Sequence, residues 1–182
     1  DRMRSDAGTP FVTDAHGAVI KPNPLNDLRV RRALSMAMNR DGIVRQVMEG
    51  AAIPSGQFLP PGAYSHVPDL PPPAFNPDAA KKLLADAGFP NGFTLTIHGP
   101  NDRYINDARI IQAIGQMWSR IGVATKVDAS PWANFVARAG RQDFSVFLVG
   151  WGSNTGEASS PLRSLVATFD RGGWSEEAIT AA

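Results

Sequence analysis

The sequence of 182 residues contains no cysteine, which excludes disulfide bonds, thiolate nucleophiles and metal sites built on cysteine. Neither sign of charge is in excess, because 18 Lys and Arg are balanced by 17 Asp and Glu, which leaves a net charge of +1. No broad electrostatic surface for nucleic acid is therefore expected. Long hydrophobic runs are missing too. The longest, Phe144 to Trp151, is broken by Ser145 and Gly150 and is far shorter than the roughly 18 apolar residues of a membrane-spanning helix.

Catalytic and cofactor-binding patterns are equally scarce. His16, His66 and His98 lie far apart and have no metal-ligand spacing, so each is interpreted as a surface or hydrogen-bonding histidine. The sequence has no phosphate-binding loop, no nucleophile elbow and no carboxylates at a spacing that pairs them. Residues 150–156 nearly match the glycine pattern of dinucleotide-binding loops. The third glycine comes one residue late and the bulky Trp151 stands between the first two, so the segment is not interpreted as a dinucleotide site. We expect no catalytic residues, no metal and no cofactor, so that a binding function is favoured over a small hydrolase.

The residues present predict an α/β fold. Apolar residues make up 43% of the chain, enough for a core, while 17 Gly and 15 Pro predict many turns. Residues 54–76 hold seven prolines and predict a long loop, either a wrap across the surface or a functional segment. The first expected elements are a strand at 11–13, a helix capped by Asn26, a helix from Asp41 ended by Gly50 and a helix capped by Asn76 and ended by Gly88. A strand at 93–98 follows, then a helix with Ile110, Ile114, Met117 and Ile121 on one face, which Ile111 and Trp118 widen. The last expected elements are a strand at 123–127, a helix from Ser130-Pro131 to Gly140, a buried strand at 144–149 and a helix from Ser160-Pro161 to Thr168.

The alternation of helix and strand from residue 77 to residue 150 is typical of a sheet with crossover helices. Ligands of open α/β sheets bind at the carboxyl ends of strands. Residues 150–157 follow the last expected strand and combine an aromatic face with hydrogen-bonding groups. The candidate ligand-binding residues of this segment are Trp151, Ser153, Asn154, Thr155 and Glu157. The alternative is a glycine-rich turn with a tryptophan in the core.

A second polar segment, 99–104, also follows a strand. It provides the candidate ligand-binding residues Asn101, Arg103 and Tyr104, and the arginine can bind a carboxylate with two parallel hydrogen bonds. If the sheet is parallel here, this segment and residues 150–157 leave the same edge. The alternative is a solvated loop in which Asp102 or Asp107 caps the next helix.

The order of these motifs resembles that of solute-binding proteins that serve ABC importers of dipeptides, oligopeptides and nickel. The matching pieces lie within residues 25–168 and are Asn26-Asp27-Leu28-Arg29-Val30-Arg31-Arg32-Ala33-Leu34-Ser35-Met36-Ala37 with Asn39-Arg40, Leu59-Pro60-Pro61-Gly62, Asn76-Pro77 through Gly92-Phe93, Trp132, and Asp143-Phe144 followed by Gly150-Trp151-Gly152. Each piece alone is short, but the ordered set is specific.

The resemblance implies one lobe of a two-lobed, periplasmic-binding-protein-like fold, an α/β domain with a mixed sheet. It implies an extracytoplasmic receptor whose partners are a small-molecule or peptide ligand, the other lobe and an ABC permease in the membrane. No nucleic-acid partner is expected, because the net charge is close to zero. On this interpretation residues 1–26 are a lead-in, 27–168 the C-terminal ligand-binding lobe and 169–182 a tail, with the signal sequence upstream. A ligand-sensing receptor domain on the same scaffold is the alternative.

The sequence departs from the resemblance where a peptide would be held. Peptide-binding members have an Asp three residues after the Trp, which pairs with the peptide ammonium group, whereas this chain has Asn154. The neutral amide lacks the charge-assisted part of that bond. Thr155 replaces the tyrosine that often follows, and Glu157 is a nearby alternative source of negative charge. Trp151 matches, so the ligand is expected to be peptide-like or another small solute.

Overall fold

The computed structural model describes residues 8–141, 143–152 and 154–163. These residues divide into two compact units, and each is described by itself. The larger unit contains 8–53 and the described part of 74–149, and the smaller contains 54–73 and the described part of 150–163. None of the helices in these residues is long and apolar enough to span a membrane.

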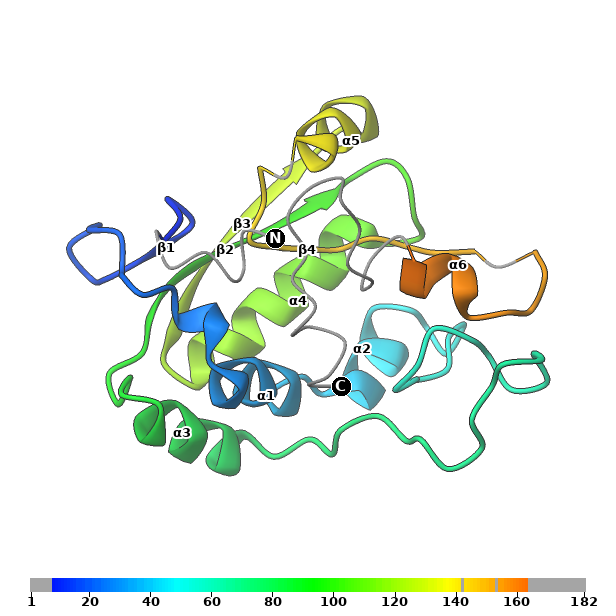
Figure 1. The fold of residues 1–182 in the computed structure, drawn as a ribbon, viewed down its shortest axis with the longest axis horizontal. Helices are drawn as coiled ribbons and strands as arrows, with labels where there is room; N and C mark the ends of the chain where they lie inside the picture. Colours follow the sequence, from blue (N-terminus) through cyan, green and yellow to red (C-terminus); the bar gives the residue numbers. More distant parts are fainter. Residues whose placement is uncertain (1–7, 142, 153, 164–182) are drawn as a thin grey trace. The chain divides into compact units, whose positions relative to one another are not determined.

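The alternation of helix and strand predicted from residue 77 onward is confirmed (Figure 1). The elements are β1 (Val12–Thr13), the 3₁₀-helix η2 (Pro24–Asn26), α1 (Leu28–Met36), α2 (Arg40–Gln46), α3 (Pro77–Asp86), β2 (Phe93–Pro100), α4 (Asp107–Arg120), β3 (Val123–Ser130), α5 (Trp132–Gly140), β4 (Val146–Phe147) and α6 (Ser159–Pro161). Asn76 caps α3 as expected, because its side chain accepts a hydrogen bond from the backbone N–H of Ala79.

The sheet is mixed and is built around β2. Strand β3 runs parallel to β2 along its whole length, from the pair Phe93–Val123 to the pair Pro100–Ser130. The opposite edge of β2 is shared by two short strands, β1, which is antiparallel, and β4, which is parallel. The predicted α/β class with a mixed sheet and crossover helices is therefore confirmed.

The core of the larger unit lies where α4 packs on β2 and β3 (Figure 1). The expected helix face is correct only in part: Ile111, Trp118 and Ile121 are buried, whereas Ile110, Ile114 and Met117 are half-buried. Gly115, which was not expected, lies at the centre of the buried face. A Cβ on Gly115 would lie 3.1 Å from a methyl group of Val127, so glycine lets the helix approach β3 closely. The indole of Trp118 also donates to the carbonyl of Leu34 at 2.9 Å, which ties α4 to α1.

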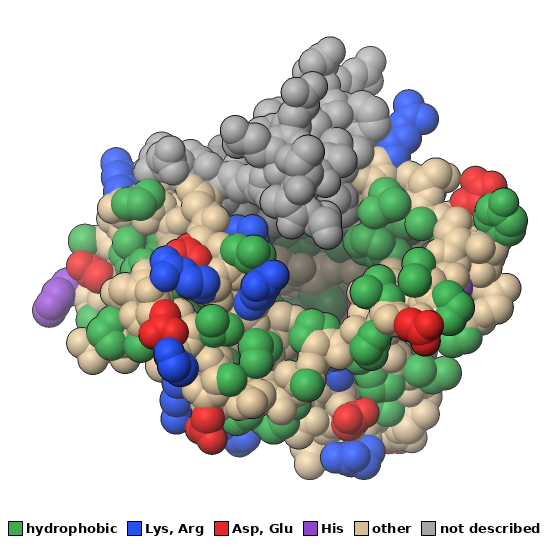
Figure 2. All heavy atoms as spheres, turned by 60° about the horizontal axis from the view of Figure 1, so that its bottom comes forward, with side chains coloured by type: hydrophobic (Ala, Val, Ile, Leu, Met, Phe, Trp, Pro, Cys, Tyr) green, Lys and Arg blue, Asp and Glu red, His purple; other side chains and the backbone are tan. Residues whose placement is uncertain are grey.

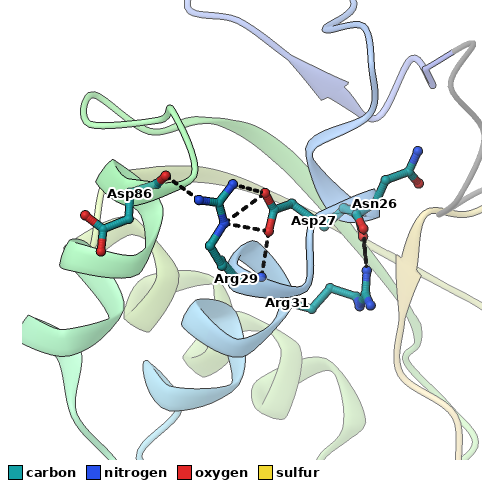
Figure 3. A network of polar contacts seen from close by, with 6 residues as sticks. Asn26, Asp27, Arg29, Arg31 and Asp86 are labelled. Carbon is teal, nitrogen blue, oxygen red and sulfur yellow. Dashed lines mark hydrogen bonds and ion pairs between the residues drawn. The ribbon is translucent and has the colours of Figure 1, made fainter. Parts of the chain in front are cut away.

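A polar network joins α1 to α3 (Figure 3). Asp27 caps α1, accepting from the backbone N–H of Arg29 at 2.7 Å, so the prediction that Asn26 is the cap was wrong by one residue. Asn26 instead ends the preceding 3₁₀-helix. The Arg29 guanidinium hydrogen-bonds to the Asp27 carboxylate, lowering the pKa of that carboxyl group, and it also donates to the backbone carbonyl of Asp86 at 2.6 Å. Arg29 therefore connects the start of α1 to the end of α3.

Three further predictions about element ends need correction. The apolar run 144–149 does not form a strand buried on both faces, because only Val146–Phe147 pairs with β2 and Phe147 is 41% exposed. Helix α2 ends at Gln46, and Gly50, with a φ of 83°, lies in the turn beyond it. Ser160 does not cap the last helix, since it lies inside α6, and the predicted continuation to Thr168 falls outside the described residues.

The proline-rich segment of the smaller unit contains no helix or strand, as predicted. It is nevertheless held by its own hydrogen bonds. The Gln57 side-chain amide donates to the carbonyl of Val67 at 2.8 Å, and its oxygen accepts from the N–H of Val67 at 2.9 Å. The backbone N–H of Ser65 donates to the carbonyl of Gly156, which joins this segment to residues 150–163.

Candidate functional site

The carboxyl ends of β2 and β3 lie at one edge of the sheet. The two strands are parallel and end together at Pro100 and Ser130, and the N–H of Asn101 donates to the carbonyl of Ser130 at 3.1 Å. The segment after β2 and the first turn of α5 are therefore neighbours. This is the edge at which open α/β sheets place their ligands.

Asp107 fixes the backbone of the segment after β2. Its buried carboxylate accepts from the N–H groups of Arg103 and Tyr104, both at 3.0 Å, and from that of Ala108 at 2.8 Å. The N-cap position of α4 belongs to Asn106, whose side chain makes no capping bond and instead donates to the carbonyl of Val47. Asp107 thus shapes the segment that carries the candidate residues.

Asp102 caps a helix, but not the one that follows it in the sequence. Its carboxylate accepts from the N–H of Trp132, the first residue of α5, at 2.7 Å. The prediction that Ser130 caps α5 was wrong, because Pro131 holds the cap position and makes no side-chain capping bond. The segment after β2 supplies the missing acceptor, so the positions of the two loops depend on each other.

Arg103 lies against two aromatic rings. Its guanidinium carbon is 5.5 Å from the ring centroid of Tyr104 and 5.3 Å from that of Trp132, and the two rings meet edge to face at 6.0 Å. We call these three residues the Arg103 platform. Within the part of the chain that the structure describes, the exposed guanidinium has no hydrogen-bond or ion-pair partner. Sequence reasoning named Arg103 and Tyr104 as ligand contacts but did not include Trp132.

A column of stacked rings supports the platform. Trp132 stacks on buried Phe135 at 5.7 Å between centroids, Phe135 on Phe144 at 5.0 Å, and Phe144 on His98 at 4.4 Å. Phe11 closes the column edge to face against His98 at 4.5 Å. His98 belongs to β2, Phe135 to α5, Phe144 to the segment just before β4, and Phe11 to the residue just before β1. The platform therefore rests on residues that are far apart in the sequence.

His98 lies at the base of this column and is only 1% exposed. Its Nδ1 is 3.4 Å from the carbonyl oxygen of Val146, and its Nε2 is 3.5 Å from a carboxylate oxygen of Asp128, which also pairs with Arg138 at 2.9 Å. Burial lowers the pKa of His98 more than Asp128 and the Val146 carbonyl raise it, and Arg138 lowers it further. His98 is therefore a neutral, structural side chain near pH 7. No cluster of three His, Cys, Asp or Glu that could hold a metal occurs within the described residues.

The other predicted site segment, 150–157, belongs to the smaller unit. Trp151 is 39% exposed, and its indole donates to the Ser160 hydroxyl at 3.3 Å. Asn154 and Thr155 are exposed, and the Glu157 carboxylate accepts from the Ser159 hydroxyl at 3.4 Å. Ser153 lies outside the described residues. Trp151 is thus partly exposed, so the alternative of a tryptophan in the core is not supported within this unit.

The surface carries no dominant charge on the face drawn in Figure 2, where basic and acidic side chains are interspersed with hydrophobic ones. This distribution agrees with the net charge of +1.

Residues 7–173 match the family described as bacterial extracellular solute-binding proteins, family 5 middle. The chain is 28% identical over 154 residues to a dipeptide-binding protein of Escherichia coli (strain K12), covering 80% of this chain and 28% of that protein. It is 30% identical over 155 residues to heme-binding protein A of Haemophilus influenzae, covering 82% of this chain and 28% of that protein.

A solved structure shows the same fold. The dipeptide-binding protein of Pseudoalteromonas sp. SM9913, in complex with Met-Leu, matches with a TM-score of 0.69 and 28% identity, covering 75% of this chain and 27% of that one. The chain thus spans less than a third of the length of these relatives. The match over part of each relative agrees with the predicted single lobe of a larger receptor.

Proposed function

The chain belongs to family 5 of the bacterial extracellular solute-binding proteins, and we propose that it is part of a receptor that captures a small solute outside the cytoplasm and delivers it to an ABC permease. The names of the relatives support binding as the function, since they bind a dipeptide in one case and heme in another. Because relatives with such different ligands share this fold, the solute has to be inferred from side chains. The Arg103 platform is the observation that supports the proposal.

The platform favours a ligand that carries a carboxylate. A guanidinium presents several N–H donors in a planar fork that matches the two oxygens of a carboxylate. The rings of Tyr104 and Trp132 hold this fork in place, so that little side-chain freedom is lost on binding. Asn101 adds an exposed amide at the same edge. We expect Asn101, Arg103 and Tyr104 to contact the acidic end of the solute.

Residues 150–157 carry a separate prediction, in which Trp151 stacks on an apolar part of the solute. Asn154 and Thr155 provide neutral hydrogen-bonding groups, Ser153 is expected to add a hydroxyl, and Glu157 supplies a negative charge. Stacking of this kind contributes about 0.5–1.5 kcal/mol beyond the area buried. Trp151→Ala should therefore weaken binding severalfold, and unchanged affinity beside a large loss of stability would mean that Trp151 only stabilises its own segment.

Weak binding to the 182-residue chain can be measured by NMR titration with the dipeptide Met-Leu at millimolar concentration. Cleft receptors divide their contacts between two lobes, so the affinity of one lobe is expected to be low. We expect Met-Leu to shift the resonances of Arg103 Nε–H and the Trp132 indole. Met-Leu with an amidated C-terminus should bind several times more weakly, because it lacks the carboxylate.

Arg103→Gln tests the role of the guanidinium, and Arg109→Gln is its matched control, because Arg109 is an exposed arginine on the neighbouring helix. The first variant should lose the preference for the free carboxylate and the second should keep it. If neither peptide shifts any resonance of the platform, the platform is not a binding surface for peptides. If both peptides shift the same resonances equally, the carboxylate assignment fails while solute binding stands.

A ligand-sensing receptor on the same scaffold is the second candidate function. It would bind the solute in the same way but pass the signal to a partner other than a permease. Reconstitution of transport in membrane vesicles with the matching permease distinguishes the two, because only a transport receptor stimulates solute uptake.

A further inference from the structure

The buried side chain of His98 has one ring nitrogen without a hydrogen bond. Its Nε2 atom has no hydrogen-bond partner in the part of the chain that the structure describes, and it lies 3.5 Å from Oδ2 of Asp128. The two residues are neighbours in the parallel ladder of β2 and β3. A neutral imidazole gains little from a carboxylate at this distance, whereas a protonated imidazole forms an ion pair with it. Protonation of His98 would therefore create an attraction to Asp128 that the neutral form lacks.

Arg138 already holds the carboxylate oxygen that His98 faces. Its Nη1 atom donates to the same Oδ2 atom of Asp128 at 2.9 Å. The guanidinium carbon also lies 4.7 Å from the ring centroid of Phe144, and this ring stacks on His98 at 4.4 Å. A protonated His98 would therefore compete with Arg138 for one oxygen, and two cations that repel each other would lie against one ring.

Helix α5 depends on this ion pair because the helix buries only one of its side chains, Phe135. The Asp102 carboxylate holds the first turn through the N–H of Trp132, and Arg138 attaches the last turn to β3. Trp132, the first residue of α5, is also one of the two rings against which Arg103 lies. A change in the partner of Arg138 therefore alters how α5 and its tryptophan are held.

We propose that Asp128 positions the Arg103 platform through Arg138, and that protonation of His98 draws the shared carboxylate away from Arg138 and loosens the platform. The consequence for a solute rests on the proposed function, since the carboxylate of the solute would be held near neutral pH and released as the pH falls. Burial lowers the pKa of His98, so the change is expected below about pH 6.5, the ordinary value for histidine.

The charged groups around His98 come from the two elements that the proposal joins. Within the described residues Asp128 faces it from β3 and raises its pKa, and Arg138 faces it from α5 and lowers its pKa. Lys126 shares the face of β3 with Asp128 but is exposed. The neighbours just before β1 and in β4 contribute an aromatic ring and a carbonyl group, which are uncharged. Asp128 is therefore the counterion that a protonated His98 would take.

Acid titration of the ligand-free chain, followed by NMR, tests this coupling without any solute. We expect the resonances of the Trp132 indole N–H and the Arg103 Nε–H to shift with the same midpoint as the ring protons of His98. Platform resonances that stay constant while His98 is protonated would overturn the inference. A chain that unfolds before His98 is protonated overturns it as well, because the platform is then lost with the whole fold.

Two variants locate the cause of the shift. His98→Gln removes the titrating group and should abolish the shift of the platform resonances. Asp128→Asn should abolish it too, because Arg138 then has no charged oxygen to lose. Asp86→Asn is the matched control, since it removes another partly exposed aspartate from an ion pair, that with Lys82 on α3, and should leave the shift unchanged. Equal shifts in Asp128→Asn and Asp86→Asn contradict the role of Asp128.

The affinities of Met-Leu and of its C-terminal amide at pH 7 and pH 5 measure the consequence for binding. The carboxylate of the free dipeptide stays ionised at both values, because its pKa is about 3.3–3.7. The severalfold preference for the free carboxylate at pH 7 should approach equality at pH 5, and in Asp128→Asn it should be near equality at both. A preference that is unchanged at pH 5 refutes the inference but leaves solute binding intact. If Met-Leu shifts no resonance at either pH, the proposed function fails, while the ligand-free titration still decides whether Asp128 positions the platform.

Discussion

Replacing Asp107 tests whether the segment after β2 is built as described. In Asp107→Ala the N–H groups of Arg103, Tyr104 and Ala108 lose the carboxylate that they share. A hydrogen bond to a charged group contributes about 1.5–3 kcal/mol, but the N–H groups of an exposed segment regain water when it is lost. Counting about 1 kcal/mol for each of the three bonds predicts a loss of about 3 kcal/mol in the free energy of unfolding.

Urea denaturation measures this loss, and Asp69→Ala is the matched control, because Asp69 is an exposed aspartate in the proline-rich segment. Asp107→Asn keeps one acceptor oxygen and should cost about 1–2 kcal/mol. Amide hydrogen exchange adds a local measurement, since Arg103 and Tyr104 should lose protection in Asp107→Ala while the amides of β2 keep theirs. If the variant is as stable as Asp69→Ala and both amides remain protected, the role assigned to Asp107 is refuted.

Three further predictions concern stability. Leu84→Ala should lower the free energy of unfolding by about 2–5 kcal/mol, because Leu84 is 1% exposed. Ile114→Ala should lower it less, because Ile114 is half-buried, so equal urea midpoints for the two variants would contradict the assigned helix faces. Asp102→Ala removes the cap of α5 and should cost about 1 kcal/mol in thermal or urea unfolding. Burial lowers the pKa of His98 in the folded protein. The contribution of the neutral imidazole to stability is therefore fully present above about pH 6.5, the pKa of an unfolded histidine, and is lost as the pH falls through the folded pKa. His98→Gln should therefore flatten the fall in stability between neutral and acidic pH, whereas exposed His16→Gln should not; equal pH profiles would refute this assignment.

Local signals in the sequence were sufficient for most of the elements. Asn76-Pro77 marked the start of α3, and the alternation of Phe93, Leu95 and Ile97 marked β2, because capping and side-chain periodicity act over a few residues. The ordered motifs were enough to indicate the family, which the match over residues 7–173 then showed. The pattern of polar residues after a strand also singled out Arg103 and Tyr104, although their contact with a ligand stays a prediction.

Contacts between distant residues were decided only by the tertiary structure. Asp102 and Trp132 are thirty residues apart, and their capping bond exists because β2 and β3 are parallel and end together. The same pairing brings Trp132 to Arg103 and completes the platform. His98 continued an alternating strand pattern as a polar residue, yet the rings of Phe11 and Phe144 bury it. A sequence pattern shows which side chains share a face, whereas which faces meet depends on how strands from separate parts of the chain pair in the sheet.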